Sequence, residues 1–173
     1  IANESQLLTG KPVLYCCNVL ESDINTGNAH VETVRARAAA EGAGVVMISG
    51  KIEAELSQLE PDEKAVFLEE LGLKESGLDS VIRAAFKLLG LSTYFTAGVQ
   101  EVRAWTFKTG SKAPVCAGVI HSDFERGFIR AETISWKDFE THGSQQACKE
   151  KGLMRSEGKE YVVQDGDILH FLF

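Results

Sequence analysis

The sequence lacks the loop with which many nucleotide hydrolases hold a triphosphate. The pattern GxxxxGK[ST] occurs nowhere in its 173 residues, and the Gly-Lys pairs at residues 10–11 and 158–159 lack the flanking pattern. Such a loop cradles the phosphates and helps to seat a magnesium ion, and positioning supplies most of the catalysis in this reaction class. We therefore expect no catalytic residue and no metal ligand in this chain, and no nucleotide hydrolysis by it.

Cysteine is scarce, and its positions form no metal or disulfide pattern. The four cysteines are Cys16, Cys17, Cys116 and Cys148, and no two have the CxxC spacing. Free thiols in a core, in a reducing cytoplasm, are the simplest interpretation. No apolar run reaches about 18 residues and no signal peptide is visible, so we expect a cytoplasmic protein without a membrane segment.

Positive charge is in short supply in the first half of the chain. Residues 1–91 carry 8 Lys and Arg against 14 Asp and Glu, whereas residues 92–173 carry 10 against 11, and the formal net charge is −7. A surplus of acidic groups disfavours contact with a phosphate backbone. Only the second half has a balance that leaves room for a local basic face.

The pattern of the first half predicts a strand, a helix and a second, parallel strand. Residues 13–17 and 45–48 are short, continuous apolar runs, which are typical of strands covered on both faces. Between them, Asn28 is a good helix N-cap, and Gly42 follows the expected helix end. A strand, a helix and a strand within about 35 residues favour a βαβ unit.

Helices complete the first half, and short strands dominate the second. Pro61 suits a first helical turn, and residues 76–79 resemble a capping box ahead of an apolar stripe that ends near residue 90. We expect a domain boundary within residues 89–96. Beyond it, strands are predicted at residues 102–107, 115–120, 129–134, 161–163 and 168–172. Short helices are predicted at residues 123–127, 136–141 and 145–151. This mixture indicates an α+β domain.

Two loops follow the expected parallel strands and form a candidate site. Asn18 comes directly after the first strand, and Ser49 and Gly50 follow the second. Ligands bind at the carboxyl ends of strands in open α/β sheets, and an Asn amide can bond to the edge of a purine. The alternative is that both segments are ordinary turns, since Asn, Ser and Gly are common turn formers.

A second candidate cluster combines cationic and aromatic residues. It contains Arg126, Arg130, Lys149, Lys151 and Arg155, interleaved with Phe124, Phe128 and Trp136. Such mixtures can bind RNA through phosphates and stacked bases. The alternative is a solvated surface over core aromatics.

Two further patterns invite a chemical interpretation but favour structural roles. Cys116 with His121 and Asp123 could suggest a cysteine hydrolase, yet a helix cap explains the His-Ser-Asp segment better. Asp165 and Asp167 flank a glycine and are expected to be turn residues rather than metal ligands.

Several long segments resemble one known family. They are KPVLYCCNVLE at residues 11–21, residues 53–77, TYFTAGVQEVRAW at 93–105, HSDFERGFIRAET at 121–133 and DGDILHFLF at 165–173. Together they resemble the carboxyl-terminal portion of the YchF, or Obg-like ATPase, family of P-loop proteins.

The resemblance implies a division of the chain into two domains. Residues 1–90 would be the last part of a nucleotide-binding domain of α/β type, a partial P-loop sheet with helices. Residues 91–173 would be a TGS domain, an α+β domain of β-grasp, ubiquitin-like fold. The family's P-loop, switch regions and inserted coiled coil have no counterpart in this sequence.

The resemblance also assigns roles in binding a nucleotide base. Asn18 would read the base and Val19 would lie against adenine. Glu21 stands where relatives that read guanine have Asp, and Ser49 and Gly50 match the second base-side loop. Lys51 stands where family members often carry a small residue.

The leading functional hypothesis is the carboxyl-terminal portion of a ribosome-associated ATPase that prefers ATP to GTP. ATP or GTP with Mg²⁺ would be bound by the full-length protein, and the ribosome or its RNA would be the partner. The alternative is a stand-alone β-grasp adaptor for RNA or protein, without nucleotide chemistry.

Overall fold

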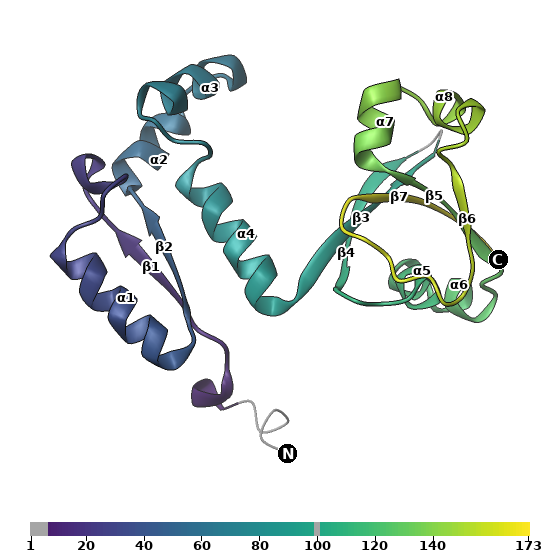
Figure 1. Cartoon of the computed structure of the whole chain (residues 1–173), viewed down its shortest axis with the longest axis horizontal. Coiled ribbons are helices and arrows are strands. Elements are labelled where there is room, and N and C mark those ends of the chain that lie inside the picture. Colours follow the sequence, from purple (N-terminus) through teal and green to yellow (C-terminus); the bar gives the residue numbers. More distant parts are fainter. Residues whose placement is uncertain (1–6, 99–100) are drawn as a thin grey trace. The chain divides into compact units, whose positions relative to one another are not determined.

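The computed structural model describes residues 7–98 and 101–173, and it divides into two compact units at Leu89–Gly90 (Figure 1). We call them the first and the second unit. The first unit contains η1 (Leu8–Gly10), β1 (Leu14–Asn18), η2 (Glu21–Asp23), α1 (Ala29–Glu41), β2 (Gly44–Ile48), α2 (Gly50–Leu56), α3 (Pro61–Glu70) and α4 (Gly77–Leu89).

The βαβ unit predicted from the sequence is confirmed. β1 pairs with β2 in parallel, in a register that runs from Leu14 opposite Gly44 to Asn18 opposite Ile48. The Asn28 side chain accepts hydrogen bonds from the backbone of two residues in the first turn of α1, and Gly42 ends that helix in the left-handed conformation. Local capping therefore sets both ends of the connecting helix.

Helices cover both faces of the parallel pair, as the apolar runs predict, but the two strands are only partly buried. Tyr15 on β1 donates a hydrogen bond to Glu41 of α1, while Ile48 of β2 lies against the start of α4. Helices thus contact both faces, as Figure 1 shows for α1 and α4. The described sheet of this unit has only two strands, however, and Cys16 is exposed while Cys17 is half-buried. These two thiols are therefore not core residues.

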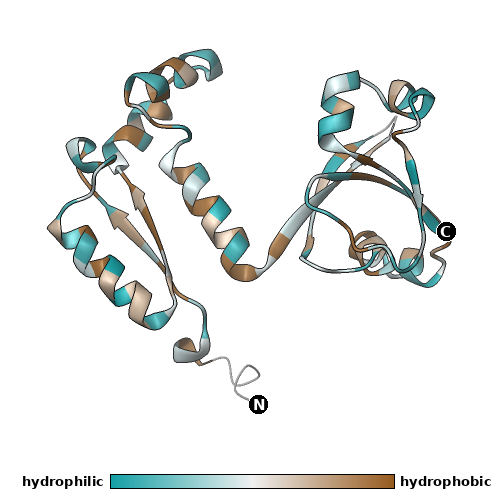
Figure 2. Cartoon of the chain, in the orientation of Figure 1, coloured by the Kyte–Doolittle hydropathy of each residue, from teal (hydrophilic) through white to brown (hydrophobic). Residues whose placement is uncertain are grey.

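The helix α4 carries the predicted apolar stripe and the predicted cap. The Ser76 hydroxyl accepts a hydrogen bond from the backbone N–H of Asp79 at 3.0 Å. Apolar residues line α4 in Figure 2, yet Leu78 and Leu89 are more than half exposed, at 59% and 54%. The sequence pattern thus predicts the helix correctly, although part of its apolar face lacks a covering element among the described residues.

The second unit is built on a mixed five-stranded sheet. Its elements are β3 (Leu91–Ala97), β4 (Val102–Lys108), α5 (Ala113–Ile120), α6 (Ser122–Arg126), β5 (Arg130–Ser135), α7 (Trp136–His142), α8 (Gln145–Glu150), β6 (Arg155–Glu157) and β7 (Asp167–Leu172). The strand order is β4-β3-β7-β5-β6, and β3 and β7 run parallel while the other neighbours are antiparallel.

One face of this sheet packs against α5 to form the core of the second unit. Tyr94 and Phe107 come from β3 and β4, Phe171 comes from β7, and Cys116 and Ala117 come from α5. The Tyr94 hydroxyl donates a hydrogen bond of 2.8 Å to the carbonyl of Cys116, so the one polar group of that fully buried ring is satisfied.

Two of the predicted strands are wrong. Residues 115–120 belong to α5, whose N-cap is Lys112 and whose first turn contains proline. The prediction failed because an apolar run of eight residues does not by itself distinguish a buried strand from a buried helix. Residues 161–163 form only an isolated bridge, between Val162 and Lys112. The strands β3 and β6 were not predicted, whereas the three short helices after α5 were.

Candidate functional site

The loops after β1 and β2 meet at the carboxyl end of the parallel pair. Asn18 ends β1, and its Oδ1 accepts a hydrogen bond from the backbone N–H of Gly50, the first residue of α2, at 3.0 Å. Beside it, the N–H of Val19 donates to the carbonyl of Ile48 at 2.8 Å and extends the ladder by one bond. The two candidate loops are therefore joined directly by the Asn18 side chain.

This bond fixes the orientation of the Asn18 amide. Since Oδ1 accepts from Gly50, the amide group Nδ2 is the donor that remains, and it has no hydrogen-bond partner among the described residues. An NH₂ group suits an acceptor such as a purine N7. Ser49 is buried and Gly50 is exposed, so backbone without a side chain is what a planar ligand would meet beside Asn18.

An ion pair forms a second bridge between the same loops. The Lys51 ammonium lies 2.9 Å from the Glu21 carboxylate and 3.7 Å from that of Glu55. The hydrogen bond to Glu21 raises the pKa of Lys51, with a further electrostatic contribution from the same carboxylate. Nothing in the sequence pattern pointed to this pairing. Glu21 is thus occupied by a cation.

The structure does not bring the five basic candidates onto one face. Paired residues share a face of a sheet and successive residues alternate between faces. Arg155 lies opposite the buried Thr133 and shares its face, whereas Arg130, three residues earlier on β5, lies on the other. Arg126 is on α6, and Lys149 and Lys151 are at the end of α8.

Arg155 has a structural role that the sequence did not reveal. Its guanidinium donates to the Tyr161 hydroxyl at 3.0 Å, and that hydroxyl donates to the buried Asp167 carboxylate at 2.6 Å. Burial raises the pKa of Tyr161 to about 12, with Asp167 adding to the effect. Arg155 therefore compensates a carboxylate inside the second unit.

The aromatic candidates have separate surroundings. Phe128 is a core residue, in agreement with the structural alternative. Phe124 stacks on Phe173 with ring centroids 3.8 Å apart, and Trp136 is 43% exposed. Of the three, Trp136 alone offers a large exposed aromatic surface.

The cysteine-hydrolase hypothesis is wrong. Cys116 is fully buried, and burial raises the pKa of its thiol to about 12, the opposite of what a nucleophile needs. The His121 ring caps α6 by accepting from the N–H of Asp123 at 3.2 Å. Asp165 lies in the turn before β7, and its carboxylate accepts from the backbone N–H of Thr93 on β3 at 2.7 Å.

Residues 7–98 and 101–173 contain neither a metal-binding cluster nor a membrane-crossing helix. That part of the chain holds no cluster of three or more His, Cys, Asp or Glu side chains able to bind a metal ion. Within the same part of the chain, no helix combines the length and the apolar character needed to cross a membrane.

The class of protein follows from the two units together. An α/β unit with loops at the carboxyl end of a parallel strand pair precedes a separate unit with a mixed sheet, and this arrangement matches solved GTP-binding proteins. The superposition on the "YchF GTPase" of Schizosaccharomyces pombe gives a TM-score of 0.82 at 34% identity and covers 98% of this chain and 46% of that one. A Pyrococcus horikoshii GTP-binding protein shares the fold, with a TM-score of 0.62 at 19% identity and coverages of 94% and 46%.

Sequence comparisons identify the family. Residues 91–173 match the family YchF-GTPase_C, described as a protein of unknown function (DUF933). The chain is 57% identical over 175 residues to the "Ribosome-binding ATPase YchF" of Bacillus subtilis and 42% identical over 176 residues to the "Obg-like ATPase 1" of Rattus norvegicus. Each alignment covers 100% of this chain, but only 48% and 44% of the relatives. The chain belongs to the YchF/Obg-like ATPase family and spans about half the length of these relatives.

Proposed function

We propose that the chain is part of a ribosome-associated ATPase, in which the first unit contributes the purine-base site. The observation that carries this proposal is the bond from the Gly50 N–H to the Asn18 side chain, because it joins two loops where α/β proteins bind nucleotides. Asn18 then donates to the base, Val19 supplies apolar surface, and Ser49 and Gly50 admit the ring closely. Two relatives are named "Ribosome-binding ATPase YchF", which supports ATP as the nucleotide and the ribosome as the partner.

The assignment of the base site is tested by NMR titration with AMP. The amides of Val19 and Gly50 should shift on addition of millimolar AMP to the labelled chain. Asn18→Asp keeps the acceptor for the Gly50 N–H but removes the NH₂ donor, so it should weaken the response at least tenfold, the factor expected for about 1.4 kcal/mol. An unchanged titration of this variant would place base recognition elsewhere.

A preference for ATP over GTP belongs to the same proposal. Guanine readers in related proteins use an Asp, and Glu21 is one methylene longer, which displaces its carboxylate by about 1.5 Å. Hydrogen bonds tolerate only a few tenths of an ångström, so the two bonds to guanine would be weakened. Equal dissociation constants of the full-length protein for the two nucleotides would refute this preference.

Hydrolysis requires groups that this sequence does not supply. The phosphates and Mg²⁺ would be held by the family's P-loop and switch regions, to which no segment of this chain corresponds. The chain alone should therefore show no metal-dependent turnover. Turnover that follows the pure protein through successive chromatographic steps would contradict this part of the proposal.

We further propose that residues 91–173 are a TGS domain of β-grasp fold that contacts the ribosome, in a cytoplasmic protein. The parallel pairing of β3 with β7 and the packing of α5 on one face support the β-grasp assignment. Arg126 and Arg130 are cationic candidates that, unlike Arg155, make no ion pair with the buried Asp167. Reversing both charges should weaken ribosome co-sedimentation and flatten its salt dependence, whereas Arg155 variants would confound binding with stability.

Unchanged co-sedimentation of the double variant would move the ribosome contact to another surface. The competing hypothesis for the chain is a stand-alone β-grasp adaptor for RNA or protein, without nucleotide chemistry. The two are separated by the intact mass of the natural protein, because an ATPase of this family requires a chain about twice as long as this one.

A further inference from the structure

Lys51 breaks a local rule of helix structure. It is the second residue of α2, and the positive end of a helix dipole disfavours a cation in the first turn. Acidic residues are the usual choice there, and Glu53 is the one acidic residue in the first turn of α2. Residues that violate a local preference are expected at functional sites, where another requirement outweighs the cost.

The compensation for Lys51 comes from the opposite loop. Its ammonium contacts Glu21 at 2.9 Å, next to the contact between Asn18 and Gly50 at 3.0 Å. The hydrogen bond and the ion pair therefore both join the loop after β1 to the start of α2. The Lys51 side chain is 69% exposed and that of Glu21 is 40% exposed, so both charges are open to a ligand.

The two purines place opposite demands on this pair. Guanine offers N–H donors at N1 and N2, which need a free carboxylate, and an ammonium on that carboxylate repels them. Adenine has an acceptor at N1 and an NH₂ donor at N6, so it matches an ammonium beside a carboxylate. A bare carboxylate would instead repel adenine N1.

We propose that Lys51 is a specificity-determining residue, which makes the base site prefer adenine by masking Glu21 and presenting a donor to N1. This inference rests on the proposed purine-base site. It differs from a preference set by the length of Glu21 alone, because it assigns the discrimination to the cation.

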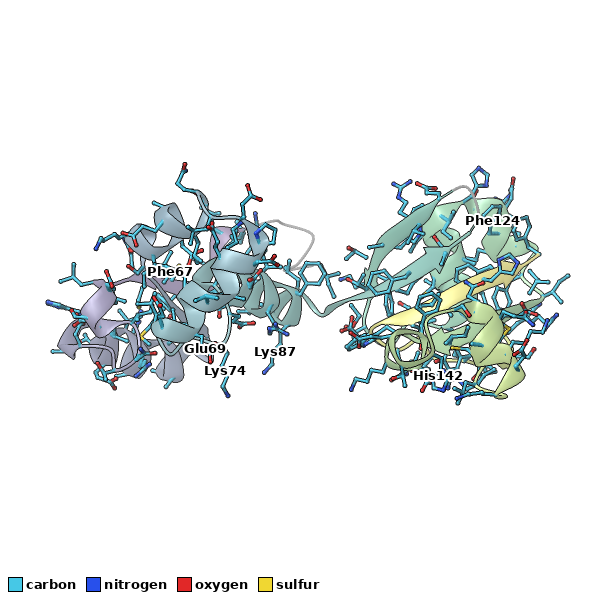
Figure 3. The ribbon with its side chains drawn as sticks, turned by 90° about the horizontal axis from the view of Figure 1, so that it is seen from above. Phe67, Glu69, Lys74, Lys87, Phe124 and His142 are labelled. Atoms are coloured by element: carbon cyan, nitrogen blue, oxygen red, sulfur yellow. The ribbon has the colours of Figure 1, made fainter. Side chains whose placement is uncertain are left out.

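Titration of the labelled chain with AMP and GMP tests the inference, with the amides of Val19 and Gly50 as probes. AMP should bind more tightly, so the dissociation constant for GMP divided by that for AMP should exceed one in the wild type. Lys51→Met should lower that ratio about tenfold, the factor of one charged hydrogen bond, and Lys51→Arg should preserve most of it. Lys74→Met is the matched control, since Lys74 points away from the ribbon on the same unit (Figure 3) and should leave the ratio unchanged.

Glu21→Gln separates the two explanations of specificity. If Lys51 decides, this variant retains the preference for AMP because the ammonium is still present. If Glu21 decides, Glu21→Gln removes the preference and Lys51→Met does not, which overturns the inference while leaving the base site intact. A wild-type chain without any AMP preference also overturns it, and the absence of any response to either nucleotide refutes the base site as well.

Discussion

Glu53 joins two helices of the first unit, and replacing it by Gln should weaken the start of α4. Its carboxylate accepts hydrogen bonds from the backbone N–H groups of Gly77 at 2.7 Å and Leu78 at 3.3 Å, which lie 24 and 25 residues further along the chain. These are two of the four N–H groups that a helix cannot satisfy internally. A negative charge at that end is also favoured by the helix dipole.

The magnitude follows from these contacts. Gln keeps one acceptor oxygen but loses the second oxygen and the charge, so one hydrogen bond of about 1 kcal/mol and a dipole interaction of about 0.3–1 kcal/mol are removed. We expect Glu53→Gln to lower the free energy of unfolding by about 1–2 kcal/mol. For a unit of this size the melting temperature should fall by roughly 4–15 °C.

Thermal unfolding followed by circular dichroism measures this change, and hydrogen exchange at the amides of Gly77 and Leu78 locates it. Glu69→Gln is the matched control, because Glu69 lies on α3 (Figure 3) and makes the same change of charge. If both variants melt at the same temperature, the carboxylate of Glu53 does not stabilise α4. In that case the Ser76 cap alone holds the start of this helix.

Three predictions concern the second unit. Burial raises the pKa of Tyr161 from 10.0 to about 12, so the neutral hydroxyl stabilises the fold below pH 10 and this contribution is lost as the pH rises to about 12. Tyr161→Phe should therefore lose less stability at alkaline pH than the wild type. Identical stability-against-pH profiles of the two proteins would contradict this. Cys116 should resist alkylation in the folded chain while the exposed Cys16 reacts, and equal rates by mass spectrometry would show that the core opens readily. Gly166 has φ of +83°, and a Cβ there would clash with Cδ1 of Trp136, so Gly166→Ala should destabilise the unit by about 2–4 kcal/mol. At Gly158 an added Cβ meets nothing within 4 Å, so a melting temperature of Gly166→Ala equal to that of Gly158→Ala would show that the contact with Trp136 relaxes freely.

Features set by neighbouring residues could be predicted from the sequence, and features set by distant residues could not. Asn28 and Ser76 cap their helices through bonds that span two or three residues, so their sequence signals are sufficient. The strand β3 has polar residues among its apolar ones, and its burial depends on pairing with β4 and with β7. In the pairing with β7, Phe95 lies opposite Ile168, 73 positions further along the chain. The sequence pattern of β3, taken alone, therefore resembles that of a linker.

The same distinction applies to the candidate site. The two loops around Asn18 and Gly50 could be brought together by reasoning, because adjacent parallel strands end at the same edge. The pairing of Lys51 with Glu21 depends on side-chain conformations that the sequence pattern does not specify. The sequence makes Arg155 a candidate for RNA contact because its cross-strand neighbours, and hence its proximity to Asp167, cannot be read from the pattern.

The position of β7 in its sheet governs how the second unit can fold during synthesis. This strand occupies the centre of the sheet, between β3 and β5, yet it is the last of the five strands along the chain. A growing polypeptide that already exposes β3 to β6 still lacks the strand that joins them, so its apolar face stays open to water and to other chains. The core can close only after Leu172 has left the ribosome, which makes folding of this unit a late, non-local and comparatively slow event.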